Sequence, residues 1–302
     1  DVARALETLQ DRLPPFPTED AKKQIEASLL KPVAELYSSL SEPVAAASIA
    51  QVHVGETTDE ASKKVAVKVL RPGIAQEFAK DLSAFAFAAR MAERYSAEAR
   101  RLRLRAVVDT LALSVALELD LRMEGAAASE LAENTKNDRD FRVPAIDWNR
   151  TAGHVLTSEW IDGTPIRDPK DVEAAGHDPK RIAVVVVQSF LTQALRDGFF
   201  HADLHPGNLF VDGEGRLVAV DFGIMGRLDP AMRRFLAETL GGFLARDYMR
   251  VAEVHYGAGF VPRSHPIETF AQALRAVGEP ILGRTAGDVS MAKLLAQLFD
   301  TT

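Results

Sequence analysis

Two short motifs decide the fold of this chain: His201-Ala202-Asp203-Leu204-His205-Pro206-Gly207-Asn208 and Asp221-Phe222-Gly223. Between them, an apolar run follows Asn208, the residues of a hairpin turn follow at 212–215, and a second apolar run ends at Asp221. This pattern predicts a β-hairpin with Asn208 at the start of one strand and Asp221 at the end of the other. Their side-chain oxygens would then lie side by side, where they can share a divalent metal ion.

Asp203 precedes Asn208 by five positions (208 − 203 = 5), which is the spacing of the protein-kinase catalytic loop H-R-D-x-x-x-x-N; D-F-G follows that loop in kinases. Phosphoryl transfer requires metal ions that neutralise the developing charge and a carboxylate near the acceptor. We therefore expect Asp203 on the acceptor side, and Asn208 and Asp221 at the metal. Asp, Asn and Gly are also ordinary turn residues, but two motifs joined by a strand-turn-strand favour the catalytic interpretation.

The N-terminal half carries a candidate phosphate-binding lysine. Lys68 in Val65-Ala66-Val67-Lys68 matches the kinase V-A-I-K strand, whose lysine holds the α- and β-phosphates. A small-residue loop precedes it, in the position of the kinase glycine-rich loop. The loop consists of Ala45, Ala46, Ala47, Ser48, Ile49, Ala50 and Gln51. Alanine allows close backbone approach but resists positive φ, so we expect a stiffer nucleotide loop than a glycine-rich one.

Composition excludes several protein classes. The chain has 302 residues, 36 Lys and Arg against 43 Asp and Glu, a net charge of −7 and no cysteine. The lack of cysteine excludes disulfides and thiolate catalysis, and the acidic balance argues against nucleic acid as a partner. The most apolar run, 182–195, is too short to cross a bilayer, which needs about 20 residues; we interpret it as a buried core helix.

The rest of the chain alternates between helical and strand patterns. Leucines at helical spacing followed by Pro14, Pro15 and Pro17 predict a helix, a break and a second helix within residues 1–40. Short β runs are expected within 43–70, with a hairpin loop at 56–64. Two long helical stretches should follow at about 74–98 and 103–134, then a strand-loop-strand region at 141–161. From Asp171 onward the pattern is mostly helical, with a strand-rich insert near 208–222.

Taken together, these motifs resemble the UbiB-type atypical kinases of ubiquinone biosynthesis over nearly the whole chain. The matching segments are Leu9-Gln10-Asp11, Pro14-Pro15-Phe16-Pro17, 49–53, 65–68, 118–124, 159–163 and the two motifs quoted first. The resemblance implies an α+β, bilobal protein-kinase-like fold with extra N-terminal helices. It implies an N-terminal lobe with β structure and inserted helices at 1–158, a hinge at 159–163 and a mainly helical C-terminal lobe at 164–302.

The resemblance also implies roles for individual residues. Lys68 would grip the phosphates of ATP, Glu124 would be its ion-pair partner, and Asp203 would be the catalytic aspartate. Asn208 and Asp221 would hold Mg²⁺. The backbone of the hinge residues Glu159, Trp160 and Ile161 would pair with adenine.

Two further acids, Glu118 and Asp120, match an E-x-D element that lies over the active site in the family. On a continuous helix Asp120 and Glu124 would share a face, whereas Glu118 would point elsewhere. The sequence therefore leaves open which acid reaches Lys68.

Two features argue against a conventional protein kinase. Ala202 replaces the arginine of H-R-D, which commonly pairs with a phosphorylated activation loop. The segment after D-F-G is short, because Pro230 is expected to open a helix, and a peptide-docking segment with A-P-E does not fit. We expect ATP hydrolysis or transfer to a small or lipid-like acceptor. A small-molecule phosphotransferase of the aminoglycoside or choline kinase type, and a nucleotide-binding pseudokinase scaffold, are the alternatives.

The resemblance implies ATP and Mg²⁺ as cofactors and a role in ubiquinone synthesis at a membrane. Implied partners are a quinone-precursor phenol or lipid, other ubiquinone-biosynthesis proteins and a membrane surface. The implied location is the cytoplasmic face of a bacterial inner membrane, or the matrix side of the mitochondrial inner membrane. The family's upstream K-x-G-Q element and apolar C-terminal helices are not in this chain, and its polar N-terminus, which begins at Asp1, does not have the pattern of a signal peptide. We interpret the chain as the soluble core of a longer protein.

An arginine-rich stretch spans residues 90–105. It contains Arg90, Arg94, Arg100, Arg101, Arg103 and Arg105. The stretch predicts either a basic helical face for anionic lipid headgroups or an ordinary solvated face with Glu93 and Glu98 as neighbours.

Overall fold

The protein is described by a computed structural model that covers residues 14–262 and 264–280. The covered chain divides into two compact units, 14–187 with 201–225, and 188–200 with 226–280. The chain passes between them within α9 (Pro179–Thr192), β7 (Phe199–His201) and β10 (Met225–Arg227). The hinge predicted at 159–163 falls inside the first unit, and the lobe boundaries stay a prediction. The first predicted helix, the Leu9-Gln10-Asp11 segment and the chain end lie outside the described residues.

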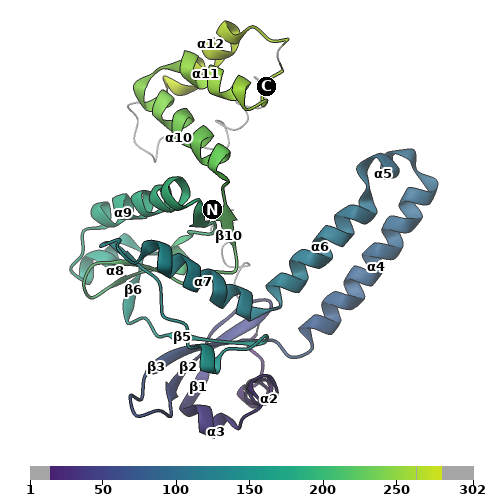
Figure 1. Cartoon of the computed structure of the whole chain (residues 1–302). Coiled ribbons are helices and arrows are strands. Elements are labelled where there is room, and N and C mark those ends of the chain that lie inside the picture. The colour runs from purple at the N-terminus through teal and green to yellow at the C-terminus, as the bar shows by residue number, and fades with distance from the viewer. Residues whose placement is uncertain (1–13, 263, 281–302) are drawn as a thin grey trace. The chain divides into compact units, whose positions relative to one another are not determined.

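The first unit contains a four-stranded antiparallel sheet in the order β1-β2-β3-β5 (Figure 1). The strands are β1 (Tyr37–Ala46), β2 (Ala50–Thr57), β3 (Lys64–Leu70) and β5 (Val155–Glu159). Val65, Val67 and Val69 are buried in one core with Ile25 of α2 (Thr18–Leu29). Since side chains alternate along a strand, Lys68 lies on the opposite face of β3.

The strand β1 starts earlier than the sequence pattern indicated. It follows the short helix α3 (Val33–Leu36) directly, and Tyr37 already pairs with Thr57 of β2. The Tyr37 side chain is buried and its hydroxyl lies 2.7 Å from the Thr157 hydroxyl of β5. This burial, which also raises the pKa of Tyr37 to about 12, is a tertiary effect that overrides the helical pattern predicted up to residue 40.

A helical arm is inserted in the sequence between β3 and the later elements of the unit. It consists of α4 (Ile74–Tyr95), α5 (Ala97–Leu102) and α6 (Leu104–Glu118), and α7 (Leu121–Thr135) follows it. In Figure 1, α4 and α6 run side by side and extend away from the sheet. The predicted continuous helix over 103–134 is wrong. Asp120 interrupts it because its backbone is extended and its carboxylate accepts the Arg122 N–H as the N-cap of α7.

A second sheet in the same unit has the order β4-β9-β8-β6. Its strands are β4 (Phe141–Arg142), β6 (Gly163–Pro165), β8 (Leu209–Asp212) and β9 (Leu217–Ala219). The hairpin β8–β9 is the one predicted between Asn208 and Asp221. Strand β6 approaches β8 so closely that a Cβ at Gly163 would lie 2.8 Å from the Val211 carbonyl oxygen, which explains the glycine there.

One arginine connects the two sheets. The guanidinium of Arg142 lies 3.0 Å from the Glu159 carboxylate at the end of β5 and 3.3 Å from Asp212 of β8. Short elements complete the unit: η1 (Trp148–Arg150), α8 (Pro169–Ala174) and η3 (Pro206–Asn208). Through Arg142, these charge pairs connect the end of β5 to the end of β8.

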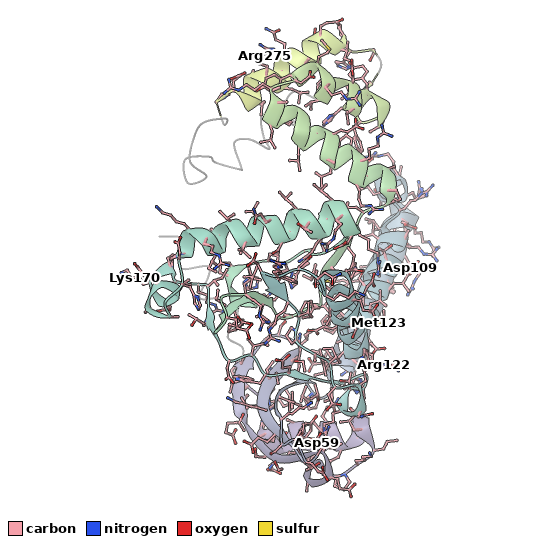
Figure 2. All side chains as sticks on the ribbon, turned by 60° about the vertical axis from the view of Figure 1, so that its left-hand side comes forward. Asp59, Asp109, Arg122, Met123, Lys170 and Arg275 are labelled. Atoms are coloured by element: carbon pink, nitrogen blue, oxygen red, sulfur yellow. The ribbon has the colours of Figure 1, made fainter. Side chains whose placement is uncertain are left out.

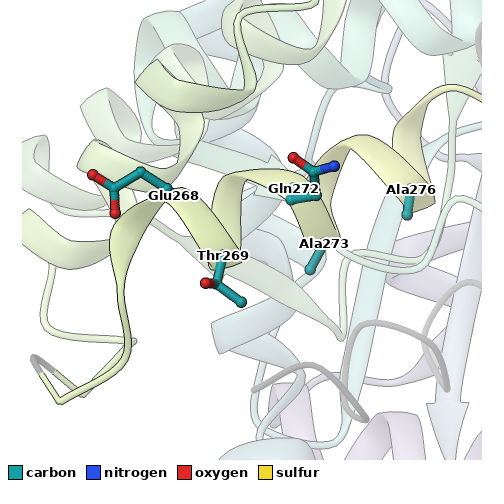
Figure 3. A pocket seen from close by; sticks show the side chains of 5 residues that line it. All are labelled: Glu268, Thr269, Gln272, Ala273 and Ala276. Atoms are coloured by element: carbon teal, nitrogen blue, oxygen red, sulfur yellow. The ribbon is translucent and has the colours of Figure 1, made fainter.

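The second unit is helical. It contains the π-helical turn η2 (Gln193–Asp197), α10 (Pro230–Ala245), α11 (Tyr248–Gly257) and α12 (Ile267–Gly278). Helix α10 opens at Pro230, as predicted, with Asp229 as its N-cap. The buried core of this unit includes Tyr248, Val251, Phe270 and Leu274. A shallow depression on this unit is lined only by side chains of α12, from Glu268 to Ala276 (Figure 3), and gathers no catalytic chemistry.

The apolar run predicted as a buried core helix is buried on one side only. Ile182 and Val185 of α9 are buried, whereas Val184 and Val187 are more than half exposed. None of the helices in the described part of the chain combines the length and apolar composition that a bilayer-spanning segment needs.

Candidate active site

The centre of the candidate site is an ion pair between Lys68 and Glu124. The Lys68 ammonium lies 2.8 Å and 2.9 Å from the two carboxylate oxygens of Glu124. Lys68 comes from the face of β3 that is turned away from α2. Glu124 lies in the first turn of α7, which begins immediately after the Asp120 cap. The helix break at Asp120 therefore determines which acid reaches the lysine.

Asp221 joins this pair from the D-F-G segment. Its Oδ1 lies 3.1 Å from the Lys68 ammonium, and the Phe222 N–H donates to Glu124 Oε1 at 3.3 Å. Asp221 has φ 64°, a left-handed conformation that is uncommon outside glycine, although aspartate adopts it more readily than most residues. Non-glycine residues in this region cluster at functional sites, where the surrounding structure holds them.

The three side chains tune one another's protonation. Burial lowers the pKa of Lys68, but the carboxylates of Glu124 and Asp221 outweigh it and raise that pKa above its ordinary value. Burial also raises the pKa of Glu124, against the attraction of Lys68. The Lys68 charge overcomes burial at Asp221 and lowers its pKa. Lys68 is therefore a permanent cation and Asp221 a permanent anion at neutral pH.

The two residues predicted for the catalytic loop, Asp203 and Asn208, lie together beside this cluster. Asn208 Nδ2 donates to both the carbonyl oxygen and Oδ2 of Asp203, each at 3.3 Å. The Val220 N–H donates to the Asn208 carbonyl at 2.9 Å, so the hairpin sets Asn208 beside the residue that precedes Asp221. Because its NH₂ group is used by Asp203, Asn208 keeps Oδ1 available as an acceptor.

This donor set suits Mg²⁺. Mg²⁺ prefers hard oxygen ligands and is commonly bound by one or two protein groups together with substrate phosphates and water. The Asp221 side chain is half exposed, and the Asn208 Oδ1 would supply a second oxygen. The described residues contain no group of three or more His, Asp or Glu that could hold a metal by themselves.

His201 ties the catalytic loop to the D-F-G segment through the backbone. Its Nε2–H donates to the Asp221 carbonyl at 2.9 Å, and the Asp203 N–H donates to its Nδ1 at 3.1 Å. The ring is fully buried and lies against Phe222. Burial lowers the pKa of His201, so the neutral tautomer positions both motifs. In contrast to His201, the His205 side chain is half exposed, and its Nε2 lies 3.7 Å from Asp203 Oδ2.

The alanine-rich segment is the tip of the β1–β2 hairpin. Ala45 and Ala46 end β1, Ala50 begins β2, and the Ala47 N–H donates to the Ala50 carbonyl at 2.8 Å. The Ile49 carbonyl accepts the Arg71 N–H at 2.7 Å. Ala47 and Ser48 are exposed. These residues therefore remain candidates for contact with nucleotide.

The side chain of Gln51 makes contacts that the sequence did not indicate. Its side chain is fully buried, Oε1 accepts the Phe16 N–H at 3.0 Å, and Nε2 donates to the Phe16 carbonyl at 3.2 Å. Nε2 also lies 2.9 Å from His53 Nε2, and His53 Nδ1 lies 2.8 Å from the Ser41 carbonyl. We name this network the Gln51 clamp; it fastens the Pro14–Pro17 segment to β2. In the sequence, Gln51-Val52-His53 places the glutamine and the histidine on one face of a strand, and this is the signal that could have indicated their contact.

Glu118 and Asp120 do not contact Lys68. Glu118 is the exposed last residue of α6, and Asp120 forms a 2.6 Å ion pair with Arg122. Leu119 and Arg122 line a cavity of about 540 Å³ at the end of β3, which does not include Lys68, Asp203 or Asp221. Figure 2 shows Arg122 and Met123 together at the start of α7.

The predicted hinge, residues 159–163, connects β5 to β6. The Trp160 N–H donates to the Lys64 carbonyl at 3.3 Å, and its indole N–H donates to Asp162 at 3.0 Å. The Lys64 ammonium lies 4.9 Å from the Trp160 ring centroid. The Trp160 N–H is thus used within the sheet, and adenine pairing by Glu159, Trp160 and Ile161 stays a prediction.

Comparison with known proteins identifies a family and several relatives. Residues 8–255 match the model of the ABC1 atypical kinase-like domain. A "Probable protein kinase UbiB" of Marinobacter nauticus is 43% identical over 100% of this chain and 56% of its own length. The protein of the same name from Azotobacter vinelandii is 40% identical over 100% of this chain and 57% of its own length. The chain therefore spans about half the length of these curated relatives.

A solved structure shares the fold. The complex of Rv3197 with erythromycin from Mycobacterium tuberculosis matches with a TM-score of 0.71 and 27% sequence identity, over 89% of this chain and 68% of that one. The expected α+β kinase-like fold and the resemblance to the UbiB family are confirmed by these matches.

Proposed function

Because the chain belongs to the ABC1 atypical kinase-like family, we propose that it binds Mg-ATP and hydrolyses it or transfers its γ-phosphoryl group, in support of ubiquinone biosynthesis. The observation that carries the proposal is the cluster of Lys68, Glu124 and Asp221, with Asn208 and Asp203 in the adjoining loop. Its cation, its metal-binding oxygens and its loop carboxylate are the parts that phosphoryl transfer requires.

The residues divide this work by their chemistry. Lys68 is a permanent cation that can hold phosphate oxygens, and Glu124 keeps its side chain in place. Asp221 and Asn208 would hold Mg²⁺, which neutralises the charge that develops on the transferred phosphoryl group. The Asp203 carboxylate is partly exposed and is fixed on one side by Asn208, so it can orient the acceptor oxygen and accept its proton.

The acceptor is proposed to be water or a small or lipid-like molecule such as a quinone-precursor phenol, rather than a protein. Ala202 supplies no charge for a phosphorylated activation loop. Only residues 224–229 separate the D-F-G segment from α10, and three of them already form β10 with Arg227 as its last residue. This leaves little chain that could bind a peptide.

The proposal is tested by ATP turnover of this chain with Mg²⁺, with and without a quinone-precursor phenol or lipid vesicles. Asp203→Asn should abolish turnover while leaving ATP binding intact, because it removes the carboxylate but not the phosphate and metal contacts. Asp109→Asn, an exposed position on α6 labelled in Figure 2, is the matched control. Equal turnover in the wild-type protein and Asp203→Asn would contradict the assignment.

A further inference from the structure

The first unit contains a cavity of about 540 Å³ that the phosphoryl-transfer chemistry proposed above does not use. Its walls come from α2, from the connection between β3 and α4, from the junction of α6 and α7, and from the loop before β5. Lys68, Asp203 and Asp221 are not among its lining residues. Pockets for small molecules have volumes of roughly 300–1,000 Å³, so the chemistry of the wall indicates which class of molecule fits.

The wall of this cavity is basic. Among the described residues that line it, Arg71, Arg122 and His154 are basic and none is Asp or Glu, although the whole chain has a net charge of −7. Gln24 and Gln76 add side-chain amides, which can donate hydrogen bonds. A wall of cations and neutral donors without a carboxylate favours an anion as its occupant.

Arg71 lines the cavity without a counter-ion. Its Nη2 donates to the Pro14 carbonyl at 3.2 Å, and its guanidinium lies 5.4 Å from the centroid of the Phe16 ring. Its Nε is buried and has no hydrogen-bond partner in the part of the chain that the structure describes. These neutral contacts hold the side chain in place but leave its charge uncompensated, and a partly buried charge is costly unless it is paired. An anion in the cavity would supply the missing pair.

Arg122 supplies a second guanidinium, at the start of α7 (Figure 2). Its Nε and Nη2 bind the two carboxylate oxygens of Asp120 at 2.8 Å and 2.6 Å. This bidentate pair fixes the plane of the guanidinium and leaves the two N–H groups of Nη1 for a further acceptor. Two guanidinium groups at one cavity can share an anion that has several acceptor oxygens.

The first turn of α4 lies against the same cavity. Gly73 is the N-cap of this 22-residue helix, has φ 81° and provides no side-chain cap. The Ala75 N–H, which belongs to this turn, has no acceptor among the described residues. Free N–H groups and the helix dipole both favour negative charge at such a terminus. The helix therefore acts in the same direction as the two arginines.

Apolar side chains complete the wall. Leu70, Ile74 and Leu119 line the cavity beside the basic residues, and they would contact the carbon skeleton of an organic molecule. We propose that the cavity binds a small organic anion, a molecule that carries a phosphate or a carboxylate group. The anionic group binds Arg71 and Arg122, and the apolar part packs against the three aliphatic side chains. This inference does not depend on the ATP chemistry proposed above.

The experiment is calorimetric titration of the whole chain with phenyl phosphate, benzoate and benzamide. The first two probes distinguish phosphate from carboxylate, and benzamide is a neutral molecule of the same shape as benzoate. We expect saturable binding of phenyl phosphate, benzoate or both, and at least tenfold weaker binding of benzamide. Saturating Mg-ADP should not displace the anion, because Lys68 and Asp221 do not line the cavity.

A charge variant tests the guanidinium of Arg122. Arg122→Gln should lower the affinity for the anion at least tenfold, a loss of 1.4 kcal/mol, because it removes a charge-assisted contact. The variant keeps the backbone N–H that Asp120 caps. Arg139→Gln, at an exposed position outside the cavity, changes the net charge equally and should bind the anion as the wild type does.

A second variant fills the cavity without a change in charge. Ala27 of α2 lines the cavity and is exposed, so Ala27→Phe should abolish binding of the anion. Ala84→Phe, at an exposed alanine of α4 outside the cavity, is the matched control and should bind normally. Circular dichroism should be unchanged in both variants, because neither alanine belongs to a buried core.

Four results would overturn the proposal. They are absence of saturable binding of both anions, equal affinity for benzamide, equal losses in the cavity variants and their controls, and displacement of the anion by Mg-ADP. The last result would assign the anion to the nucleotide site.

Discussion

Lys68 and Glu124 are separated by 56 positions in the sequence, and their side chains meet at 2.8 Å between β3 and the first turn of α7. Asp221, a further 97 positions on (221 − 124 = 97), reaches the same ammonium at 3.1 Å. The long insertion α4–α6 lies between the first two. The helix cap at Asp120, rather than helical periodicity through the insertion, sets the register of Glu124.

Glu124→Gln should weaken ATP binding and destabilise the fold. The substitution leaves Lys68, which is about one-fifth exposed, without its closest charge partner. Removing one member of a buried ion pair costs about 3 kcal/mol or more. Urea unfolding should therefore show a loss of about this size, and the ATP affinity should fall by about tenfold, a loss of 1.4 kcal/mol. Glu118→Gln, at the exposed end of α6, is the control; an equal loss there would refute the assignment.

Asp221→Asn should remove the Mg²⁺-dependent part of nucleotide binding. The amide keeps the side-chain volume but loses the charge that a metal requires, while Lys68 still pairs with Glu124. In thermal unfolding, the wild-type midpoint should rise with ATP and Mg²⁺ together, and that of Asp221→Asn should not. Chelating the metal in the wild type should reproduce the variant. If the variant responded to Mg-ATP like the wild type, Asp221 would not be a metal ligand.

Gln51→Leu should destabilise the protein through the Gln51 clamp. It leaves the Phe16 N–H and carbonyl without their partners, and an unsatisfied buried polar group costs about 1–3 kcal/mol. We expect a loss of about 3 kcal/mol in chemical unfolding and earlier proteolytic cleavage near residues 14–17. Gln76→Leu, at an exposed position in α4, should change neither quantity. Unaltered cleavage in Gln51→Leu would mean that the clamp does not hold the segment.

The stability of the wild type should fall in mild acid because of His53. Burial lowers the pKa of His53, against the hydrogen bond to Ser41 and the charge of Glu42. The unfolded ring, with a pKa of about 6.5, then binds more protons than the folded ring. The lowered pKa of His53 therefore adds to the free energy of unfolding above pH ~6.5. This stabilisation is lost as the pH falls below that value, by at most about 1.4 kcal/mol per pH unit.

The measurement is the unfolding free energy of the wild type and of His53→Gln between neutral and mildly acidic pH. The neutral amide does not titrate, so the variant should lose part of the pH slope. Identical slopes would exclude His53 as the source.

Local patterns predicted much of the fold and of the candidate site. The hairpin between Asn208 and Asp221, the helix that opens at Pro230 and the strand that carries Lys68 rest on turn residues, caps and alternation, which act over a few positions. The strand start at Tyr37 and the helix break at Asp120 were missed. A buried tyrosine that bonds a strand far away in sequence, and a cap within an apparently helical run, override local propensity.

By itself, the sequence indicated the residues on which the proposed chemistry rests: a lysine, two residues at the spacing of a kinase catalytic loop, and the aspartate proposed to bind metal. It could do so because motif spacing reflects backbone geometry within one loop or hairpin. Only the tertiary structure decided which acid pairs with Lys68, that the Gln51 side chain binds the backbone of Phe16, and that the arginines of 90–105 lie at the end of the α4–α6 arm. These outcomes depend on packing between segments tens of residues apart, and the free energy of such contacts is not encoded in any short pattern.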